Sequence, residues 1–206
     1  MLNNENLFIQ TKDEIKKLWS NNKKLSDFVI WPKNLVLKEK TINKINVTKK
    51  LSIWKSSGNS QIDKIHNLIS DLSQEVYWES GYSENEVNKE FLSKYGFFEL
   101  IGPTGHFLTS EMALWVNFLD KNSYYPPHNH EAEELYFVVS GEAKFESEDE
   151  QSKILKSKDT RFHKSYQSHS ITTFDKKILS FVIWKNKFRR AGSRRRRSTT
   201  RRRRRQ

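Results

Sequence analysis

The chain has 206 residues, no cysteine, 35% hydrophobic and 13% aromatic residues. This length allows one domain with a full hydrophobic core, the aromatic content argues against disorder, and without cysteine neither disulfides nor thiolate metal sites can form. No apolar run approaches the ~18–20 residues needed to cross a bilayer, and the N-terminus lacks the features of a secretory signal, so we expect a cytoplasmic protein with no membrane partner.

The formal charge of +12 is concentrated at the C-terminus. Eleven of the twelve arginines lie in residues 189–206, whereas residues 1–188 hold 26 basic against 25 acidic residues, a net charge of +1. Self-repulsion predicts that the arginine-rich tail is disordered. Such a tail could bind nucleic acid, but the abrupt change in composition favours an appended, non-native segment. The nearly neutral remainder gives no reason to expect a nucleic-acid function.

Residues 1–96 show mainly helical patterns. Thr11-x-x-Glu14 and Ser60-x-x-Asp63 resemble capping boxes, which begin helices. Apolar residues follow the second box at spacings of three and four, as in an amphipathic helix. We therefore expect at least two helices in this part of the chain.

Two further elements are predicted before the composition changes. Ser83-x-x-Glu86 resembles the start of another helix, with an apolar face supplied by the residues that follow. Residues 51–55, LSIWK, predict a short strand.

After residue 96 the sequence becomes rich in β-branched and aromatic residues, separated by turn signals. The segments predicted as strands are 97–102, 113–119, 134–147, 161–174 and 177–185. Five or more strands at short spacing predict an antiparallel barrel or sandwich. The expected organisation is a mostly helical part, 1–96, packed on a β-barrel, 97–188.

The segment HNHEAEELYFVVSG, 128–141, holds two of the six histidines of the chain. Because side chains alternate along a strand, His128, His130, Glu134 and Tyr136 are expected to point to one face. Two imidazoles and a carboxylate inside an apolar barrel are costly to bury, and a divalent metal would compensate that cost. The segment therefore predicts a metal site.

One more ligand is expected from outside this segment. His169 is the leading candidate, because the predicted strand resumes directly after it. His163 lies six residues upstream, also at even spacing, and is the competing candidate. A single histidine is usually an ordinary hydrogen-bonded residue, but the group as a whole favours metal binding. Its donors suit Zn²⁺, Fe²⁺, Mn²⁺, Co²⁺ or Ni²⁺, so the identity of the metal stays open.

The pattern His-x-His-x3-Glu-x6-Gly, formed by His128, His130, Glu134 and Gly141, resembles the first motif of the cupin superfamily. The usual leading glycine is replaced by Asn122, which a tight turn also tolerates. This resemblance implies a mainly β protein, an antiparallel jelly-roll barrel preceded by N-terminal helices.

The second cupin motif is matched only at its histidine, His169. Lys164, Tyr166 and Thr173 occupy the positions of its proline, glycine and asparagine. The loop before His169 is therefore expected to differ from the usual one, although the number of metal ligands is unchanged.

Several separated segments resemble more closely the Q-type cupin lyases of dimethylsulfoniopropionate (DMSP). They are YWESGYSENEV, FLSKYGFFELIGPTGHF, YYPPHNHEAEELYFVVSGEAKF and DTRFHKSYQSHSITT. The similarity runs from about Trp78 to Trp184 and stops before the tail. It implies that a barrel-bound divalent metal holds the substrate carboxylate while a tyrosine removes the proton from the neighbouring carbon. Dimethyl sulfide then leaves and acrylate remains.

The resemblance also implies roles for individual residues. Tyr136 would be the base, Tyr125 a second active-site tyrosine that contacts the substrate, and Trp184 an aromatic residue of the pocket. The metal ligands implied by position are His128, His130, Glu134 and His169.

A small-molecule substrate with a sulfonium group would favour an aromatic lining. Residues that could provide it are Trp115, Tyr124, Tyr125, Phe162, Tyr166 and Trp184. Two other functions stay open: an iron-dependent oxygenase of the same superfamily, which O₂ dependence would reveal, and a non-catalytic cupin that binds a small ligand. A potential base at Tyr136 argues against the second. The sequence does not indicate an oligomeric state.

Overall fold

The computed structural model describes residues 4–185, so the arginine-rich tail, 189–206, lies outside the described residues. The helices are α1 (Glu5–Asn21), α2 (Lys23–Phe28), α3 (Asn46–Ser52), α4 (Gln61–Leu72) and α5 (Lys89–Leu92). The strands are β1 (Val36–Leu37), β2 (Tyr95–Gly102), β3 (Phe107–Leu108), β4 (Ala113–Leu119), β5 (Ser123–His128), β6 (Glu133–Ser147), β7 (Glu150–Lys156), β8 (Thr160–His163), β9 (His169–Thr173) and β10 (Ile178–Lys185). No helix in this part of the chain is long and apolar enough to span a membrane.

One of the two capping boxes starts a helix. The Ser60 hydroxyl accepts a hydrogen bond from the Asp63 amide, and the Asp63 carboxylate accepts one from the Ser60 amide, which confirms the start of α4. The helix start predicted at Thr11 is wrong, because α1 has already begun at Glu5. The Thr11 hydroxyl instead donates to the carbonyl of Leu7 within the helix, at 2.7 Å.

The other two N-terminal predictions were displaced or wrong. Ser83 and Glu86 do hydrogen-bond to each other, but α5 starts later, where the Asn88 side chain accepts from the amide of Phe91. Residues 51–55 do not form a strand, because residues 51 and 52 are the last two of α3, and Leu51 is buried in the core.

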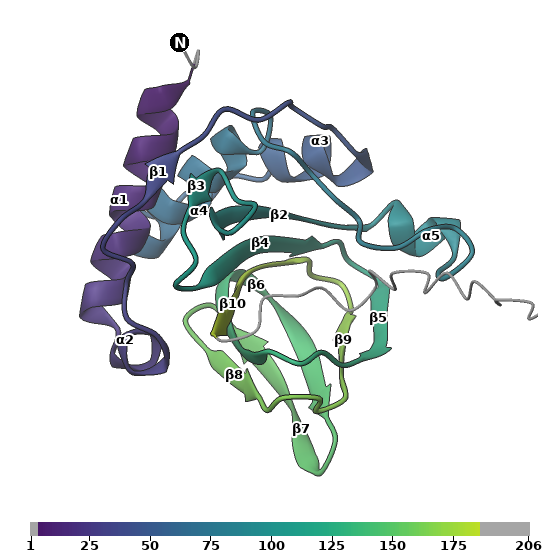
Figure 1. Cartoon of the computed structure of the whole chain (residues 1–206). Coiled ribbons are helices and arrows are strands. Elements are labelled where there is room, and N and C mark those ends of the chain that lie inside the picture. Colours follow the sequence, from purple (N-terminus) through teal and green to yellow (C-terminus); the bar gives the residue numbers. More distant parts are fainter. Residues whose placement is uncertain (1–3, 186–206) are drawn as a thin grey trace, which may run out of the picture.

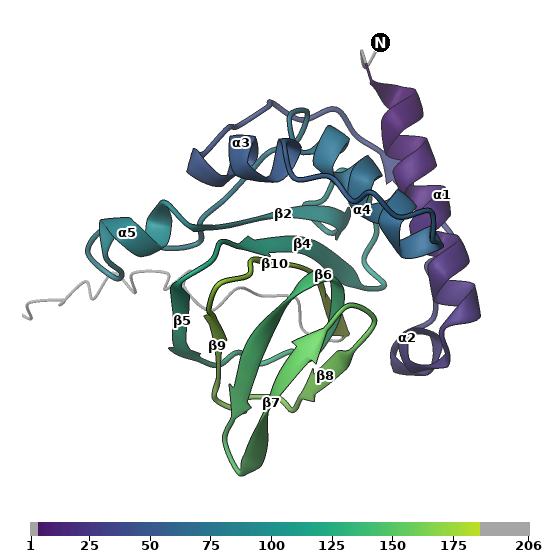
Figure 2. The ribbon, with the colours of Figure 1, turned by 180° about the vertical axis from the view of Figure 1, so that it is seen from behind.

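Strand β6 belongs to both layers of the barrel. Its first half pairs with β10 and β8, and its second half pairs with β7 and β9. The sheet order is β1-β3-β2-β4-β10-β6-β9-β5, and every pair except β2–β3 is antiparallel. The expected antiparallel barrel is thus confirmed; α3 and α4 lie on its outer side, over β2, and α1 packs against α4 (Figure 1 and, from behind, Figure 2).

The alternation of side chains along each strand creates two apolar clusters. On β10, Phe181 and Ile183 belong to the cluster that packs against the helices, whereas Val182 and Trp184 belong to the cluster inside the barrel. Every residue of β4 is buried for the same reason, because both of its faces are covered. Even positions of β10 and of the first half of β6 therefore face the interior.

Three motif positions adopt the left-handed backbone conformation that favours glycine. Gly141 has φ 81°, and a Cβ there would lie 1.8 Å from the carbonyl oxygen of Lys177, so only glycine fits. Asn122 has φ 52° in the turn before β5, as its replacement of a glycine predicted. Tyr166 also has a positive φ, 62°, at the glycine position of the second motif.

Candidate active site

The register of the strands brings the candidate residues together inside the barrel. Glu134 on β6 lies opposite Trp184 on β10 and opposite His163 on β8. His128 on β5 lies opposite His169 on β9. Since directly opposite residues point to the same side of a sheet, the strand pairing by itself brings these side chains together.

His128, His130, Glu134 and Tyr136 do not share one strand, as the sequence had suggested. Strand β5 ends at His128, and residues 129–132 carry the chain from one sheet to the other before β6 begins. All four side chains nevertheless line a single cavity. The expected convergence is correct, but it arises from two strands and the segment between them.

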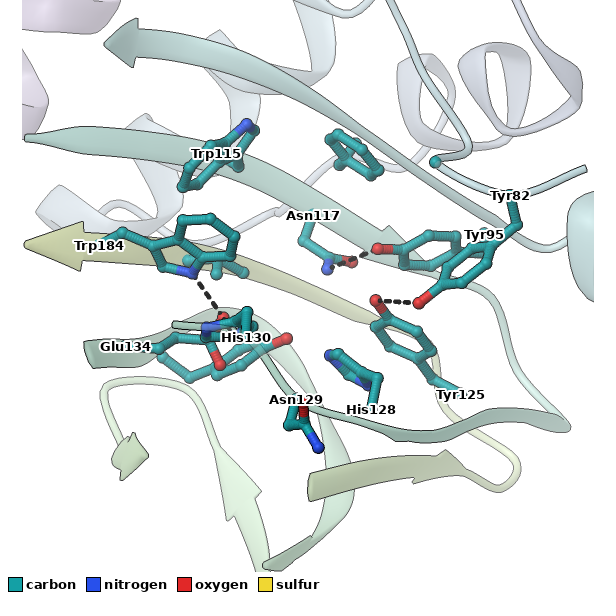
Figure 3. A pocket seen from close by; sticks show the side chains of 14 residues that line it. Tyr82, Tyr95, Trp115, Asn117, Tyr125, His128, Asn129, His130, Glu134 and Trp184 are labelled. Atoms are coloured by element: carbon teal, nitrogen blue, oxygen red, sulfur yellow. Dashed lines mark hydrogen bonds and ion pairs between the residues drawn. The ribbon is translucent and has the colours of Figure 1, made fainter. Parts of the chain in front are cut away.

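This cavity has a volume of about 240 Å³ and is mostly aromatic (Figure 3). Trp115, Tyr125 and Trp184 line it, as expected. The other residues that line it are Gly81, Tyr82, Tyr95, Phe97, Asn117, His128, Asn129, His130, Glu134, Tyr136 and Val182. Three residues expected in the lining are instead exposed at the protein surface, with exposed fractions of 37–61%: Phe162, Tyr124 and Tyr166.

Three histidines use the same ring nitrogen to bond to the backbone. A carbonyl oxygen can only accept, so each Nδ1 donates, and each Nε2 of the neutral ring carries the lone pair. The donor–acceptor pairs are His128 to Pro126 at 3.0 Å, His130 to Ala132 at 2.9 Å and His169 to Gln167 at 2.9 Å. A second-sphere bond of this kind is what orients histidines that bind a metal through Nε2.

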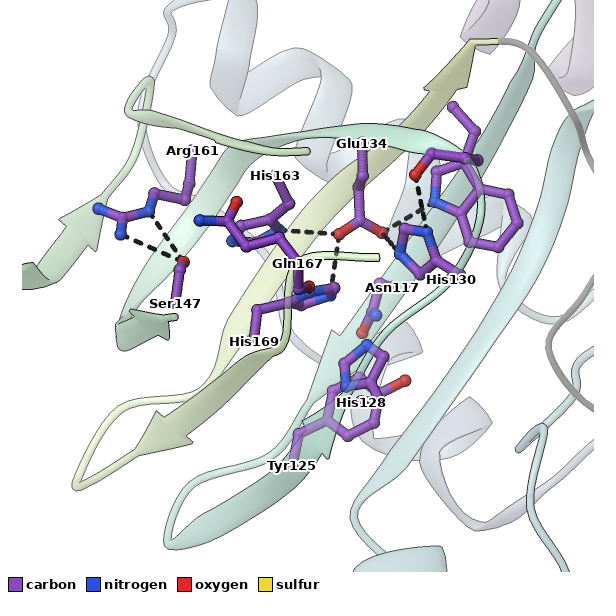
Figure 4. Close-up of polar contacts among 12 residues, drawn as sticks. Asn117, Tyr125, His128, His130, Glu134, Ser147, Arg161, His163, Gln167 and His169 are labelled. Carbon is purple, nitrogen blue, oxygen red and sulfur yellow. Dashed lines mark hydrogen bonds and ion pairs between the residues drawn. The ribbon is translucent and has the colours of Figure 1, made fainter. Parts of the chain in front are cut away.

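The Glu134 carboxylate is buried, with an exposed fraction of 2%, and contacts four side chains (Figure 4). Its Oε1 accepts from the indole Nε1 of Trp184 at 2.8 Å and lies 3.2 Å from Nε2 of His130. Its Oε2 lies 3.0 Å from Nδ1 of His163 and 3.1 Å from Nε2 of His169. The carboxylate is therefore the centre of the polar cluster.

These contacts shift the pKa values of the cluster. Burial alone would raise the pKa of Glu134, but the charge of His169 and hydrogen bonds from the surrounding imidazoles hold it well below its ordinary value. Burial tends to lower the pKa of His169, yet Glu134 outweighs it and the pKa is raised. Burial, with the charge of His169 adding to it, lowers the pKa of His128 to about 3. His128 is thus a neutral imidazole at neutral pH.

The donor atoms fit a divalent cation. The ligand atoms of His128, His130 and His169 lie within 4.8 Å of one another, and so do those of Glu134, His163 and His169. In the neutral rings, the Nε2 lone pairs of His130 and His169 face carboxylate oxygens, which are also acceptors, at 3.2 and 3.1 Å. Two acceptors this close need a proton or a cation between them. Ligands bound at ~2.0–2.2 Å to one Zn²⁺-like ion are separated by about this distance.

Comparison with known proteins identifies the family. The model of the dimethylsulfoniopropionate lyase family matches residues 33–180, more than half of the chain. The chain belongs to the DMSP lyase family. The DMSP lyase DddQ of Ruegeria pomeroyi is 32% identical over 114 residues, which are 55% of this chain and 57% of that protein, so the match spans less than two thirds of this relative.

Solved structures of DMSP lyases share the fold over most of their length. A chain from the crystal structures of the DMSP lyases RdDddP and RnDddQII superposes with a TM-score of 0.83 at 29% identity, covering 87% of this chain and 92% of the other. The crystal structure of DddQ from Ruegeria pomeroyi gives a TM-score of 0.84 at 24% identity, covering 91% and 95%. These superpositions confirm the cupin barrel with N-terminal helices.

Sequence reasoning missed part of the cavity of this DMSP lyase family member. Tyr82 comes from the segment before α5, and its hydroxyl donates to the hydroxyl of Tyr125 at 3.0 Å. Tyr95 packs against Tyr125 with ring centroids 4.6 Å apart, and Asn117 reaches the Tyr95 hydroxyl at 3.5 Å. Burial raises the pKa of Tyr125 far above its ordinary value, so its phenol is neutral. The alternation of side chains along β4 could have indicated Asn117, which lies two residues after Trp115 and so on the same face, but no local pattern pointed to Tyr82.

Proposed function

We propose that this protein cleaves DMSP by metal-dependent β-elimination, releasing dimethyl sulfide and acrylate. The observation that carries the proposal is the clustering of the Nε2 atoms of three histidines, two of which contact the buried Glu134 carboxylate, next to an aromatic cavity in a member of the DMSP lyase family. Two members of this family to which the chain is similar are named as DMSP lyases. This supports the same substrate here.

The proposed metal ligands are His128, His130, Glu134 and His169. When bound, a divalent transition metal such as Zn²⁺, Fe²⁺ or Mn²⁺ acts as a Lewis acid on the substrate carboxylate and stabilises the charge that develops as the neighbouring carbon loses its proton. The backbone carbonyls that accept from the three Nδ1 atoms keep each Nε2 directed inward. The protein thereby holds the three lone pairs in place.

Tyr136 is the proposed base for the α-proton. Its side chain is 1% exposed, lines the cavity, and comes two residues after Glu134 on β6. Burial, and then the Glu134 carboxylate, raise its pKa well above the ordinary value for a phenol. Tyr136 therefore needs a local positive charge to act as a base, which ties its role to occupation of the metal site.

The aromatic lining suits the sulfonium end of the substrate. The rings of Trp115 and Trp184 meet edge to face at the cavity, with centroids 4.4 Å apart and 63° between their planes, and Tyr125 lies across from them. A sulfonium carries positive charge without hydrogen-bond donors on sulfur, so aromatic faces recognise it by cation–π attraction. Dimethyl sulfide leaves as a neutral molecule, so its departure needs no general acid. Tyr125 and Trp184 are the proposed substrate contacts.

The test is gas-phase measurement of dimethyl sulfide from purified protein supplied with DMSP, before and after metal removal and restoration with Mn²⁺, Fe²⁺ or Zn²⁺. We expect metal-dependent release with acrylate in equal amount. Tyr136→Phe should lose the elimination and keep its metal, whereas His130→Ala should lose both; Tyr124→Phe, at the exposed surface, is the matched control. Turnover that requires O₂ would instead indicate an oxygenase, and binding without turnover a ligand-binding cupin.

A further inference from the structure

We propose that His163 is a positioning residue of the metal site: its Nδ1–H holds one oxygen of Glu134, and it does not bind the metal itself. The inference rests on the proposed function, because it assumes that Glu134 is a ligand. His163 was a competitor of His169 in the sequence, since both lie at even spacing. The structure distinguishes the two by the ring nitrogen that each presents to Glu134.

The two histidines present different nitrogens to the carboxylate. His169 donates from Nδ1 to the carbonyl of Gln167 and presents Nε2 to Glu134, as a ligand would. His163 presents Nδ1 to Oε2 of Glu134 at 3.0 Å, and this nitrogen has no backbone carbonyl partner among residues 4–185. A proton on Nδ1 of His163 completes a hydrogen bond to the carboxylate.

The far side of the His163 ring also argues against metal binding. Its Nε2 is buried and has no hydrogen-bond partner among the described residues. If Nδ1 bound a metal, the proton of the neutral ring would sit on Nε2 as a buried donor without an acceptor. If Nδ1 donates to Glu134, only the acceptor lone pair on Nε2 remains unsatisfied. Proteins tolerate a buried acceptor without a partner more readily than a buried N–H without one. The donor role leaves the smaller penalty.

Packing fixes the His163 ring in this orientation. The side chain is fully buried, and its ring stacks on that of His169 with centroids 4.0 Å apart and 14° between the planes. Strand β8 places His163 directly opposite Glu134, while Trp184 lies opposite Glu134 on the other side and donates to Oε1. Glu134 is thus held by one donor from each neighbouring strand. Together the two donors set the direction in which its remaining lone pairs point.

The inference predicts an effect on metal affinity. Loss of an outer-sphere partner of a metal ligand typically weakens metal binding about 10- to 100-fold. His163→Leu should show this loss, while the number of bound histidines stays the same. His163→Asn should restore most of the affinity, because the amide nitrogen of asparagine can occupy the place of Nδ1. His163→Gln should not, because its amide reaches the place of Nε2 instead.

The experiment is a titration of the metal-free, full-length protein with Co²⁺ against a competing chelator, followed by its d–d absorption bands. X-ray absorption of the same samples counts the bound imidazoles. His106→Asn serves as the control, since it removes a buried histidine whose Nε2 contacts the amide of Tyr77 outside the site. Thermal melts check that each variant is folded. If His163→Leu fails to fold, the comparison of His163→Asn with His163→Gln decides.

The expected result is weaker Co²⁺ binding in the Leu and Gln variants, recovery in the Asn variant, and an unchanged imidazole count. Loss of one imidazole in His163→Leu would overturn the inference by making His163 a ligand. Equal affinities of all three variants and the unmutated protein would overturn it as well. Absence of stoichiometric Co²⁺ binding by the unmutated protein would instead refute the proposed metal site. The two failures are therefore distinguishable.

Discussion

Replacing Tyr166 by glycine should stabilise the protein. Tyr166 has φ 62°, in the left-handed region, and its side chain is 61% exposed, so the substitution relieves backbone strain and removes little packing. Its amide donates to the carbonyl of His130 at 2.7 Å, which fixes this conformation beside the site. The left-handed conformation costs a non-glycine residue roughly 1–2 kcal/mol. Glycine gives back about 0.5–1 kcal/mol through the greater freedom of the unfolded chain.

The net gain for Tyr166→Gly is therefore about 0.5–1 kcal/mol in the free energy of unfolding. For a chain of this size that corresponds to a rise of about 1–4 °C in Tm. Urea denaturation of the metal-free protein measures the gain without a contribution from ligand binding. Tyr166→Ala is the matched control, because it removes the same ring but keeps a Cβ. Equal stability of the Gly and Ala variants would refute the account of backbone strain.

Three further outcomes are expected. Gly141→Ala should lower the free energy of unfolding by at least about 3 kcal/mol in urea denaturation, because its Cβ would meet the backbone of Lys177. Asp63→Ala should cost about 1 kcal/mol at neutral pH. Hydrogen bonds from Ser56 and Ser60 lower the pKa of Asp63 from 3.8 in the unfolded chain to about 2 in the folded protein. The difference in stability between the unmutated protein and Asp63→Ala should therefore shrink when urea denaturation is repeated from pH 4 down to pH 2. Trp184→Phe removes a donor to a buried carboxylate and should cost about 1.5–3 kcal/mol in the same assay.

The strands that the sequence predicted are those whose residues are buried on one face or on both. Strand β7 was missed because its sequence, EQSKILK, is exposed at six of seven positions and so carries no hydrophobic period. Strand β5 was missed for a different reason: the sequence placed His128 on one strand with Glu134 and Tyr136, whereas β5 ends at His128 and contains Pro126 and Pro127. Its place at the end of the sheet order explains how they are accommodated, since an edge strand leaves backbone amides free of the ladder.

The candidate site was predictable in composition but not in arrangement. Even spacing selected His163 and His169 alike, and only the carbonyl of Gln167 beside the His169 ring separates their roles. The bond from Trp184 to Glu134 depends on which residues of β10 and β6 lie opposite each other, and the spacing within either strand does not contain that register.

Tyr136 can act as the proposed base only if the proposed metal is bound. A phenol with its ordinary pKa of about 10 is a weak base at neutral pH, and burial beside Glu134 raises the pKa of Tyr136 further. The enclosure that suits elimination by excluding water thus works against the base unless a cation shares the cavity. Dimethyl sulfide release that persists after complete metal removal would therefore exclude Tyr136 as the base, even if Tyr136→Phe were inactive. In that case the lost activity would have to come from a change in the shape of the cavity.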